Sequence, residues 1–130
     1  MSNFPMSAHP TPIRKNAHLE QQPWGTLTIL DTGPSYQIKR LEVNPGQSLG
    51  RQLHQHLNIH WIVVAGLAKV TDNTKKMLLG ADQSWYVPRQ TCHCLENPGR
   101  FPLTLMAVEH CVFLGEGDSL QGSVGYLCSA

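Results

Sequence analysis

The stretch LHQHLNIHW, residues 53–61, places His54, His56 and His60 at even positions, shortly after Gln52. Successive side chains of a β-strand alternate between its two faces, so His54 and His56 would point to the same side of a strand. Imidazoles arranged in this way can bind one metal ion. No carboxylate lies within the stretch. It therefore predicts either a strand that contributes to a metal site or a strand with a polar face.

The segments around this stretch are short, of strand type, and separated by turn residues. No segment repeats apolar residues with helical spacing over three turns, which argues against helices. The expected strands cover residues 26–30, 36–43, 61–65, 67–70, 76–79, 84–87, 92–97 and 103–114. Eight or nine short strands with closely spaced turns predict an all-β sandwich or barrel.

The length of 130 residues is typical of a single domain with a core of its own. Residues 1–22 are polar and rich in proline, and they predict a flexible N-terminal arm. Residues 23–116 carry the strand pattern and form the expected domain. Residues 117–130 lose the pattern and predict a loose C-terminal tail.

Composition and charge exclude several classes of partner. The net charge is +1 at pH 7 and no block of lysine or arginine stands out, so we expect no nucleic-acid partner. No run approaches the roughly 18 apolar residues of a membrane span, and the N-terminus lacks the apolar segment of a secretory signal. We therefore expect no membrane association and a cytoplasmic location, where the four cysteines would stay reduced.

A second block of sequence, PRQTCHCLEN at residues 88–97, begins about twenty residues after Gly66. Pro88, His93 and Asn97 match the second block of the cupin pattern. This chain has Gln90 at the position where the family has glycine. The two blocks together resemble the cupin superfamily. This resemblance implies an all-β cupin fold, the double-stranded β-helix or jelly-roll barrel.

The resemblance narrows over residues 22–116 to the cupin domain of type II mannose-6-phosphate isomerases. In bacteria this domain often forms the C-terminal part of a protein that also carries mannose-1-phosphate guanylyltransferase. Segments such as YQIKRLEVNPG and LENPGRFPL look like that family. The chain departs from the family pattern at Leu57, where the family has arginine, and at Ile59, where it has glutamate. It also lacks the charged segment that such isomerases carry near their C-terminus.

The resemblance implies a metal site formed by Gln52, His54, His56 and His93. A ligand set without a carboxylate favours Zn or Ni over Mg or Mn, because Mg and Mn prefer oxygen ligands. Two alignments stay open. Counting back from Gly66 makes Gln52 the first ligand and puts Ile59 at the position of the acid, whereas counting from His54 and His56 puts His60 there.

Two functions follow from these observations. The resemblance implies metal-dependent aldose–ketose isomerisation of a sugar phosphate; the departures favour instead a catalytically degenerate cupin that binds a metal or a small anionic ligand in an accessory or regulatory role. A homodimer is expected, because bare edge strands invite pairing. The candidate bases are His54, His56, His60, Glu96 and Glu109, and the candidate phosphate ligands are Arg51, Arg89 and Arg100.

Overall fold

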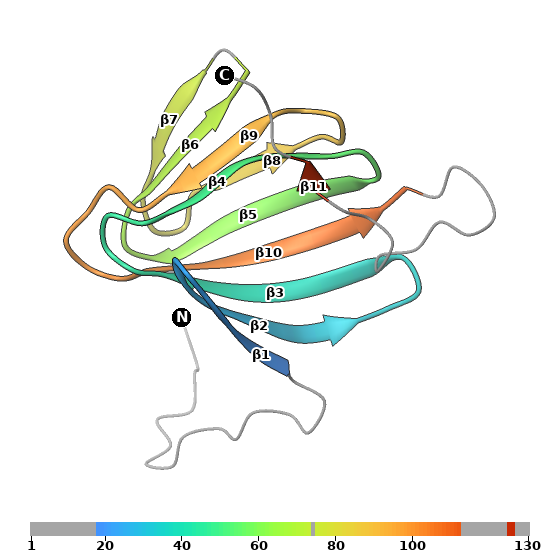
Figure 1. Ribbon diagram of the computed structural model, residues 1–130, viewed down its shortest axis with the longest axis horizontal. Helices are drawn as coiled ribbons and strands as arrows, with labels where there is room; N and C mark the ends of the chain where they lie inside the picture. Colours follow the sequence, from blue (N-terminus) through green and yellow to red (C-terminus); the bar gives the residue numbers. More distant parts are fainter. Residues whose placement is uncertain (1–17, 74, 113–124, 127–130) are drawn as a thin grey trace, which may run out of the picture.

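The computed structural model describes residues 18–73, 75–112 and 125–126, and this part of the chain contains strands and no helix (Figure 1). The strands are β1 (His18–Gln22), β2 (Gly25–Thr32), β3 (Tyr36–Val43), β4 (Ser48–His54), β5 (Leu57–Ala65), β6 (Ala68–Asp72), β7 (Lys76–Leu79), β8 (Ser84–Val87), β9 (His93–Glu96), β10 (Leu103–Cys111) and β11 (Gly125–Tyr126). The described residues therefore include no helix that could cross a membrane.

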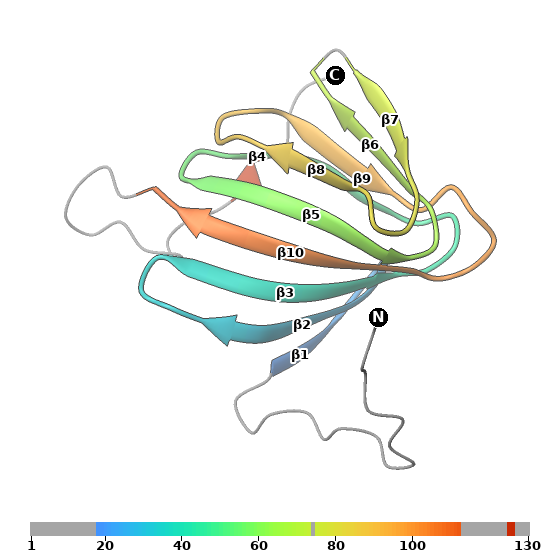
Figure 2. The same cartoon turned by 180° about the vertical axis from the view of Figure 1, so that it is seen from behind.

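The strands form two antiparallel sheets that face each other (Figures 1 and 2). One sheet has six strands in the order β1-β2-β3-β10-β5-β8, and the other has five in the order β11-β4-β9-β6-β7. Neighbours such as β3 and β10 are far apart in the sequence, as in a jelly roll. The predicted all-β architecture is confirmed.

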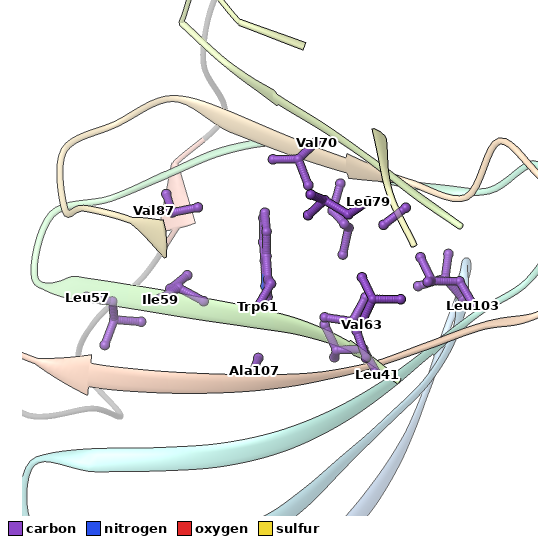
Figure 3. Close-up of a cluster of buried hydrophobic side chains, with 14 of the residues drawn as sticks. Leu41, Leu57, Ile59, Trp61, Val63, Val70, Leu79, Val87, Leu103 and Ala107 are labelled. Carbon is purple, nitrogen blue, oxygen red and sulfur yellow. The ribbon is translucent and has the colours of Figure 1, made fainter. Parts of the chain in front are cut away.

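The core lies between the sheets and follows from alternation along the strands. In β5 the buried residues are Leu57, Ile59, Trp61 and Val63, and the residues between them are more exposed. Figure 3 shows Trp61 extending from β5 toward the opposite sheet, where Val70 of β6 lies. Burial of each large aliphatic side chain contributes about 1.5–3 kcal/mol, so these alternating positions supply much of the stability.

The inner face of the six-stranded sheet changes character along its strands. In β10 the buried positions run from Leu103 and Leu105 through Ala107 to Glu109. In β3 the same face carries Val43 and Leu41 and then Lys39, which lies opposite Ala107. Ionisable side chains therefore enter the interior toward one end, where they lie among apolar residues such as Ile59, while the Leu103 end of these strands carries apolar side chains. We call these the polar end and the apolar end.

Asn97 connects the two sheets at the apolar end. It follows β9, is 1% exposed, and donates from Nδ2 to the carbonyl oxygens of Val43 at 2.9 Å and Phe101 at 2.8 Å. Its Oδ1 accepts from the backbone N–H of Gly99 at 2.9 Å. The backbone of Asn97 also pairs with the turn between β3 and β4, through Gly46 and Gln47. A single side chain thus joins the end of β3 to the β9–β10 loop.

Several expectations need correction. Residues 18–22, which were expected to belong to the arm, form β1 at the edge of the six-stranded sheet. Every residue of β1 pairs with β2. Residues 125–126, expected to lie in the tail, form β11 beside β4. The remaining arm and tail residues lie outside the described part of the chain.

The expectation that the cysteines stay reduced also needs correction. Cys92 is disulfide-bonded, whereas Cys94 is a buried free thiol.

The expected homodimer remains a prediction. Since β1 lies at a sheet edge, its outward side offers backbone groups to a second copy. We expect light scattering of the purified chain at tens of micromolar to give the mass of a dimer. A monomer at that concentration would contradict the expectation.

Candidate functional site

Two of the predicted site residues, His54 and His93, meet at the polar end of the interior. β4 ends at His54, and β9 begins at His93. Gln52 lies directly opposite His93 in the β4–β9 pairing, so Gln52 and His93 share a sheet face. The rings of His54 and His93 are stacked, with centroids 5.5 Å apart and planes inclined by 23°. The structure therefore brings Gln52, His54 and His93 together.

The orientation of His93 is set by two neighbours. Its Nδ1 lies 2.9 Å from the carbonyl oxygen of Thr91, and its ring meets the edge of Trp61 at a centroid distance of 5.3 Å. A carbonyl oxygen only accepts hydrogen bonds, so Nδ1 carries the hydrogen. In the neutral ring, Nε2 then holds a lone pair that can accept a proton or bind a ligand.

Both histidines are held in the neutral form. Burial, together with smaller contributions from His93 and Lys39, lowers the pKa of His54 from 6.5 to about 4. Burial also lowers the pKa of His93, although the hydrogen bond to Thr91 and the charge of Glu109 act the other way. At neutral pH the site therefore offers two uncharged imidazoles.

A lysine and a glutamate form an ion pair on the inner face of the opposite sheet. Nζ of Lys39 lies 2.9 Å from Oε1 of Glu109, and the two side chains are 19% and 11% exposed. Both act electrostatically on the histidines: Lys39 on His54 and Glu109 on His93. The sequence indicated Glu109 only as one of several possible bases and did not indicate Lys39. Alternation with Leu41 and Val43 was the signal that could have placed Lys39 inside.

Ile59 occupies an interior position close to this pair. It is 3% exposed and lies opposite Val87 on one side and Glu109 on the other. An apolar side chain thus fills the position at which the family pattern places its acid. The residue opposite Ile59 on the neighbouring strand supplies the buried carboxylate instead.

The prediction that His56 shares a strand face with Gln52 and His54 is wrong. β4 ends at His54, and His56 lies in the turn before β5, so strand parity does not extend to it. Within residues 18–73 and 75–112, Nδ1 of His56 is buried and has no hydrogen-bond partner. Its ring does not join those of His54 and His93 in a group that could hold a metal ion.

His60 lies on the outer face of the six-stranded sheet. It is exposed, between the buried Ile59 and Trp61, and its ring lies 4.8 Å from that of Tyr86. The alignment that put His60 at the position of the acid would therefore place that acid on the outer face of the sheet, away from His54 and His93.

Gln90 holds the β8–β9 loop against the site. Its backbone N–H donates to the carbonyl oxygen of His54 at 2.7 Å, and its φ is +63°. This left-handed conformation favours glycine, which explains why the family pattern has glycine there. A non-glycine residue adopts it at a cost of about 1–2 kcal/mol.

The candidate phosphate ligands lie in different places. Arg51 is exposed and lies opposite Cys94. Burial raises the pKa of the Cys94 thiol, and the charge of Arg51 acts in the opposite direction. Arg100 is exposed in the β9–β10 loop, at the apolar end. Only Arg89 lies beside the site: it precedes Gln90, is half-buried, and has its backbone N–H bonded to Oδ1 of Asn58.

The described residues fit a divalent metal ion poorly. They contain no group of three or more His, Cys, Asp or Glu side chains placed to hold one. A catalytic zinc usually has three protein ligands, and here two imidazoles lie together beside one neutral amide, while the ammonium group of Lys39 acts on His54. A nearby positive charge opposes the binding of a second one. The predicted metal and its Zn or Ni preference remain predictions.

The chain resembles known proteins along most of its length. Residues 13–121 match the family described as Mannose-6-phosphate isomerase C-terminal. The chain is 47% identical over 100 residues to a mannose-1-phosphate guanylyltransferase of Escherichia coli, covering 77% of the chain and 21% of that protein. It is 44% identical over 111 residues to mannose-1-phosphate guanylyltransferase ManC of Salmonella typhimurium, covering 83% and 23%. The chain thus spans less than a quarter of these relatives.

A solved structure supports the fold. The structure titled as a predicted oxalate decarboxylase from Thermotoga maritima superposes with a TM-score of 0.67 at 19% identity, covering 78% of this chain and all of that one. At this identity the likeness concerns the fold alone. The predicted cupin double-stranded β-helix is confirmed by such neighbours, which include a domain titled as a cupin, with a TM-score of 0.63.

Proposed function

The chain belongs to the family of mannose-6-phosphate isomerase C-terminal domains, and from this membership we propose that it isomerises a sugar phosphate between its aldose and ketose forms. The reaction proceeds through an enediol. It needs a base that moves a proton between adjacent carbons and a group that stabilises negative charge on the carbonyl oxygen.

The observation that carries this proposal is the concentration of ionisable groups at one end of the interior. His54 and His93 on one sheet face the Lys39–Glu109 pair on the other. Burial of charged groups is costly, and a core built only for stability would contain apolar side chains at these positions. Groups that can take up, release and stabilise protons therefore support a catalytic use of the polar end.

A second function is favoured by Ile59. An apolar residue at the position of the family acid, together with the incomplete ligand set, supports a cupin that binds a small anionic ligand without turning it over. This protein would act in an accessory or regulatory role. The two proposals differ in turnover, since both include binding of the ligand.

The test is conversion of mannose 6-phosphate to fructose 6-phosphate, followed in a coupled assay and by proton NMR in deuterium oxide. Isomerisation through an enediol exchanges the substrate C2 proton with solvent, so deuterium appears in the sugar. Turnover with exchange supports the isomerase. Saturable binding in calorimetry without turnover or exchange contradicts it and supports the accessory function.

Arg89 provides a prediction about the phosphate group. We expect Arg89→Ala to raise KM for mannose 6-phosphate by a factor of about 10–100 with little change in kcat, because a charge-assisted contact contributes about 1.5–3 kcal/mol. Arg100→Ala, at the other end of the interior, is the matched control and should leave both constants unchanged. Equal effects of the two substitutions would show that Arg89 has no special role.

A further inference from the structure

The Lys39–Glu109 pair is an unusual component of a barrel core. Its two side chains are mostly buried, and its Nζ–Oε1 distance of 2.9 Å is that of a charge-assisted hydrogen bond. Replacement of a buried ion pair by apolar residues of similar size is often neutral or stabilising. Stability alone therefore does not account for this pair.

The pair sits where a reacting sugar would meet both sheets. Glu109 lies on β10 between Gln37 of β3 and Ile59 of β5, and Lys39 lies opposite the small, buried Ala107. The histidines that act electrostatically with the pair come from β4 and β9 of the other sheet. The polar end thus holds a carboxylate, an ammonium group and two neutral imidazoles.

We propose that Lys39 and Glu109 perform the isomerisation without a divalent metal ion, an inference that rests on the function proposed above. Glu109 is the base, and Lys39 supplies the positive charge that a metal ion would otherwise provide to the carbonyl oxygen. The poor fit of the surrounding donors to a metal agrees with this assignment.

The proposed steps conserve atoms and electrons. The carboxylate of Glu109 takes the proton from C2 of the open-chain aldose, the C–H electron pair forms the C1=C2 bond, and the carbonyl pair moves to O1, beside the ammonium group of Lys39. The proton held by Glu109 exchanges with solvent at the enediol stage, and the carboxylic acid then delivers a proton to C1, which receives it on the electron pair of the C1=C2 bond. Nε2 of His93 carries the hydroxyl proton from O2 to O1, and C2 becomes the ketone carbon. No oxidant or reductant is consumed.

The first arm of the test measures metal binding without any assay of activity. The full chain is treated with EDTA, dialysed, and titrated with zinc chloride by calorimetry at pH 7. We expect no stoichiometric binding at micromolar zinc for the original chain, and at least about tenfold tighter binding for Lys39→Met, which removes the opposing charge. Lys69→Met, between the inward-facing Ala68 and Val70, is the matched control. Stoichiometric micromolar binding by the original chain would overturn the inference.

The second arm measures turnover after EDTA treatment. Glu109→Gln should lower kcat by a factor of about 100–10,000, the usual contribution of a general base. The control is Glu42→Gln, which changes a half-exposed glutamate paired with Arg40 on the same strand as Lys39. Since a single change leaves a buried charge, the double variant Lys39→Met/Glu109→Met is included. It should unfold at the same or a higher temperature and be inactive.

The outcomes separate the two proposals. An original chain that turns over no sugar phosphate, with or without zinc, contradicts the proposed function. If the original chain loses turnover on EDTA treatment and regains it with zinc, the proposed role of the ion pair is overturned, whereas the proposed isomerase function stands. A folded double variant that retains turnover also overturns the role of the pair.

Discussion

Asn97→Ala is expected to lower the free energy of unfolding by about 4 kcal/mol, because each buried polar group left without a partner costs about 1–3 kcal/mol. The substitution removes both hydrogen bonds from Nδ2, to Val43 and Phe101, and the one accepted from Gly99. The side chain is 1% exposed, so water does not readily replace these contacts. Urea unfolding at constant m-value measures the loss.

Asn44→Ala is the matched control for this prediction. Asn44 is exposed in the turn after β3, and its substitution should change stability by less than about 0.5 kcal/mol. Asn97→Asp should be at least as damaging as Asn97→Ala, since a carboxylate would face the two carbonyl oxygens. A loss below about 1 kcal/mol for Asn97→Ala would mean that the loop closes without this side chain.

The second large effect is a loss of stability on acidification. In the unfolded chain His54 takes up a proton below its ordinary pKa of 6.5, whereas in the folded chain it stays neutral until about pH 4. The unfolded state therefore binds more protons between these two values, and stability falls as pH falls through this window. For His54 the loss reaches at most about 3 kcal/mol near pH 4, and it is smaller to the extent that solvent screens the partly buried ring.

A variant isolates the contribution of His54 from that of other titrating groups. Urea unfolding is measured from pH 7 to pH 4 for the original chain, His54→Gln and His60→Gln. The His54 variant should show a shallower decline, whereas His60→Gln, which changes an exposed ring on the outer face, should follow the original chain. Identical slopes for all three proteins would contradict the assignment to His54.

The fold could be predicted because its strands alternate clearly between core and solvent. The expected bounds of β3, β7 and β8 match the structure, and each of these strands ends at a turn or loop with glycine or proline. β4 was not delimited from the sequence. Its inner face carries Gln52 and His54 instead of apolar residues, and its pairing with β9 is irregular between Ser48 and Arg51, so no alternating pattern marks it.

The candidate site could be predicted only in part, for related reasons. His54 and His93 were found because their spacing matches a known two-block pattern. The strand-face argument for His56 fails because strand parity holds only while the strand continues, and the bend at residues 55–56 ends it. Lys39 was missed because a lysine on a strand usually reaches solvent, and only its tertiary partner Glu109 accounts for its burial.

The division of the interior into an apolar end and a polar end has an evolutionary consequence. The residues that close the fold, such as Asn97, Val43 and Leu103, lie apart from His54 and Glu109 along the strands. Substitutions at the polar end leave the hydrogen bonds of Asn97 unchanged, so the sheets stay joined at the apolar end when paired charges such as Lys39 and Glu109 are replaced together. A lineage with this architecture can exchange one chemistry for another while its scaffold remains intact, and Ile59 in place of an acid is the kind of replacement that such a scaffold tolerates.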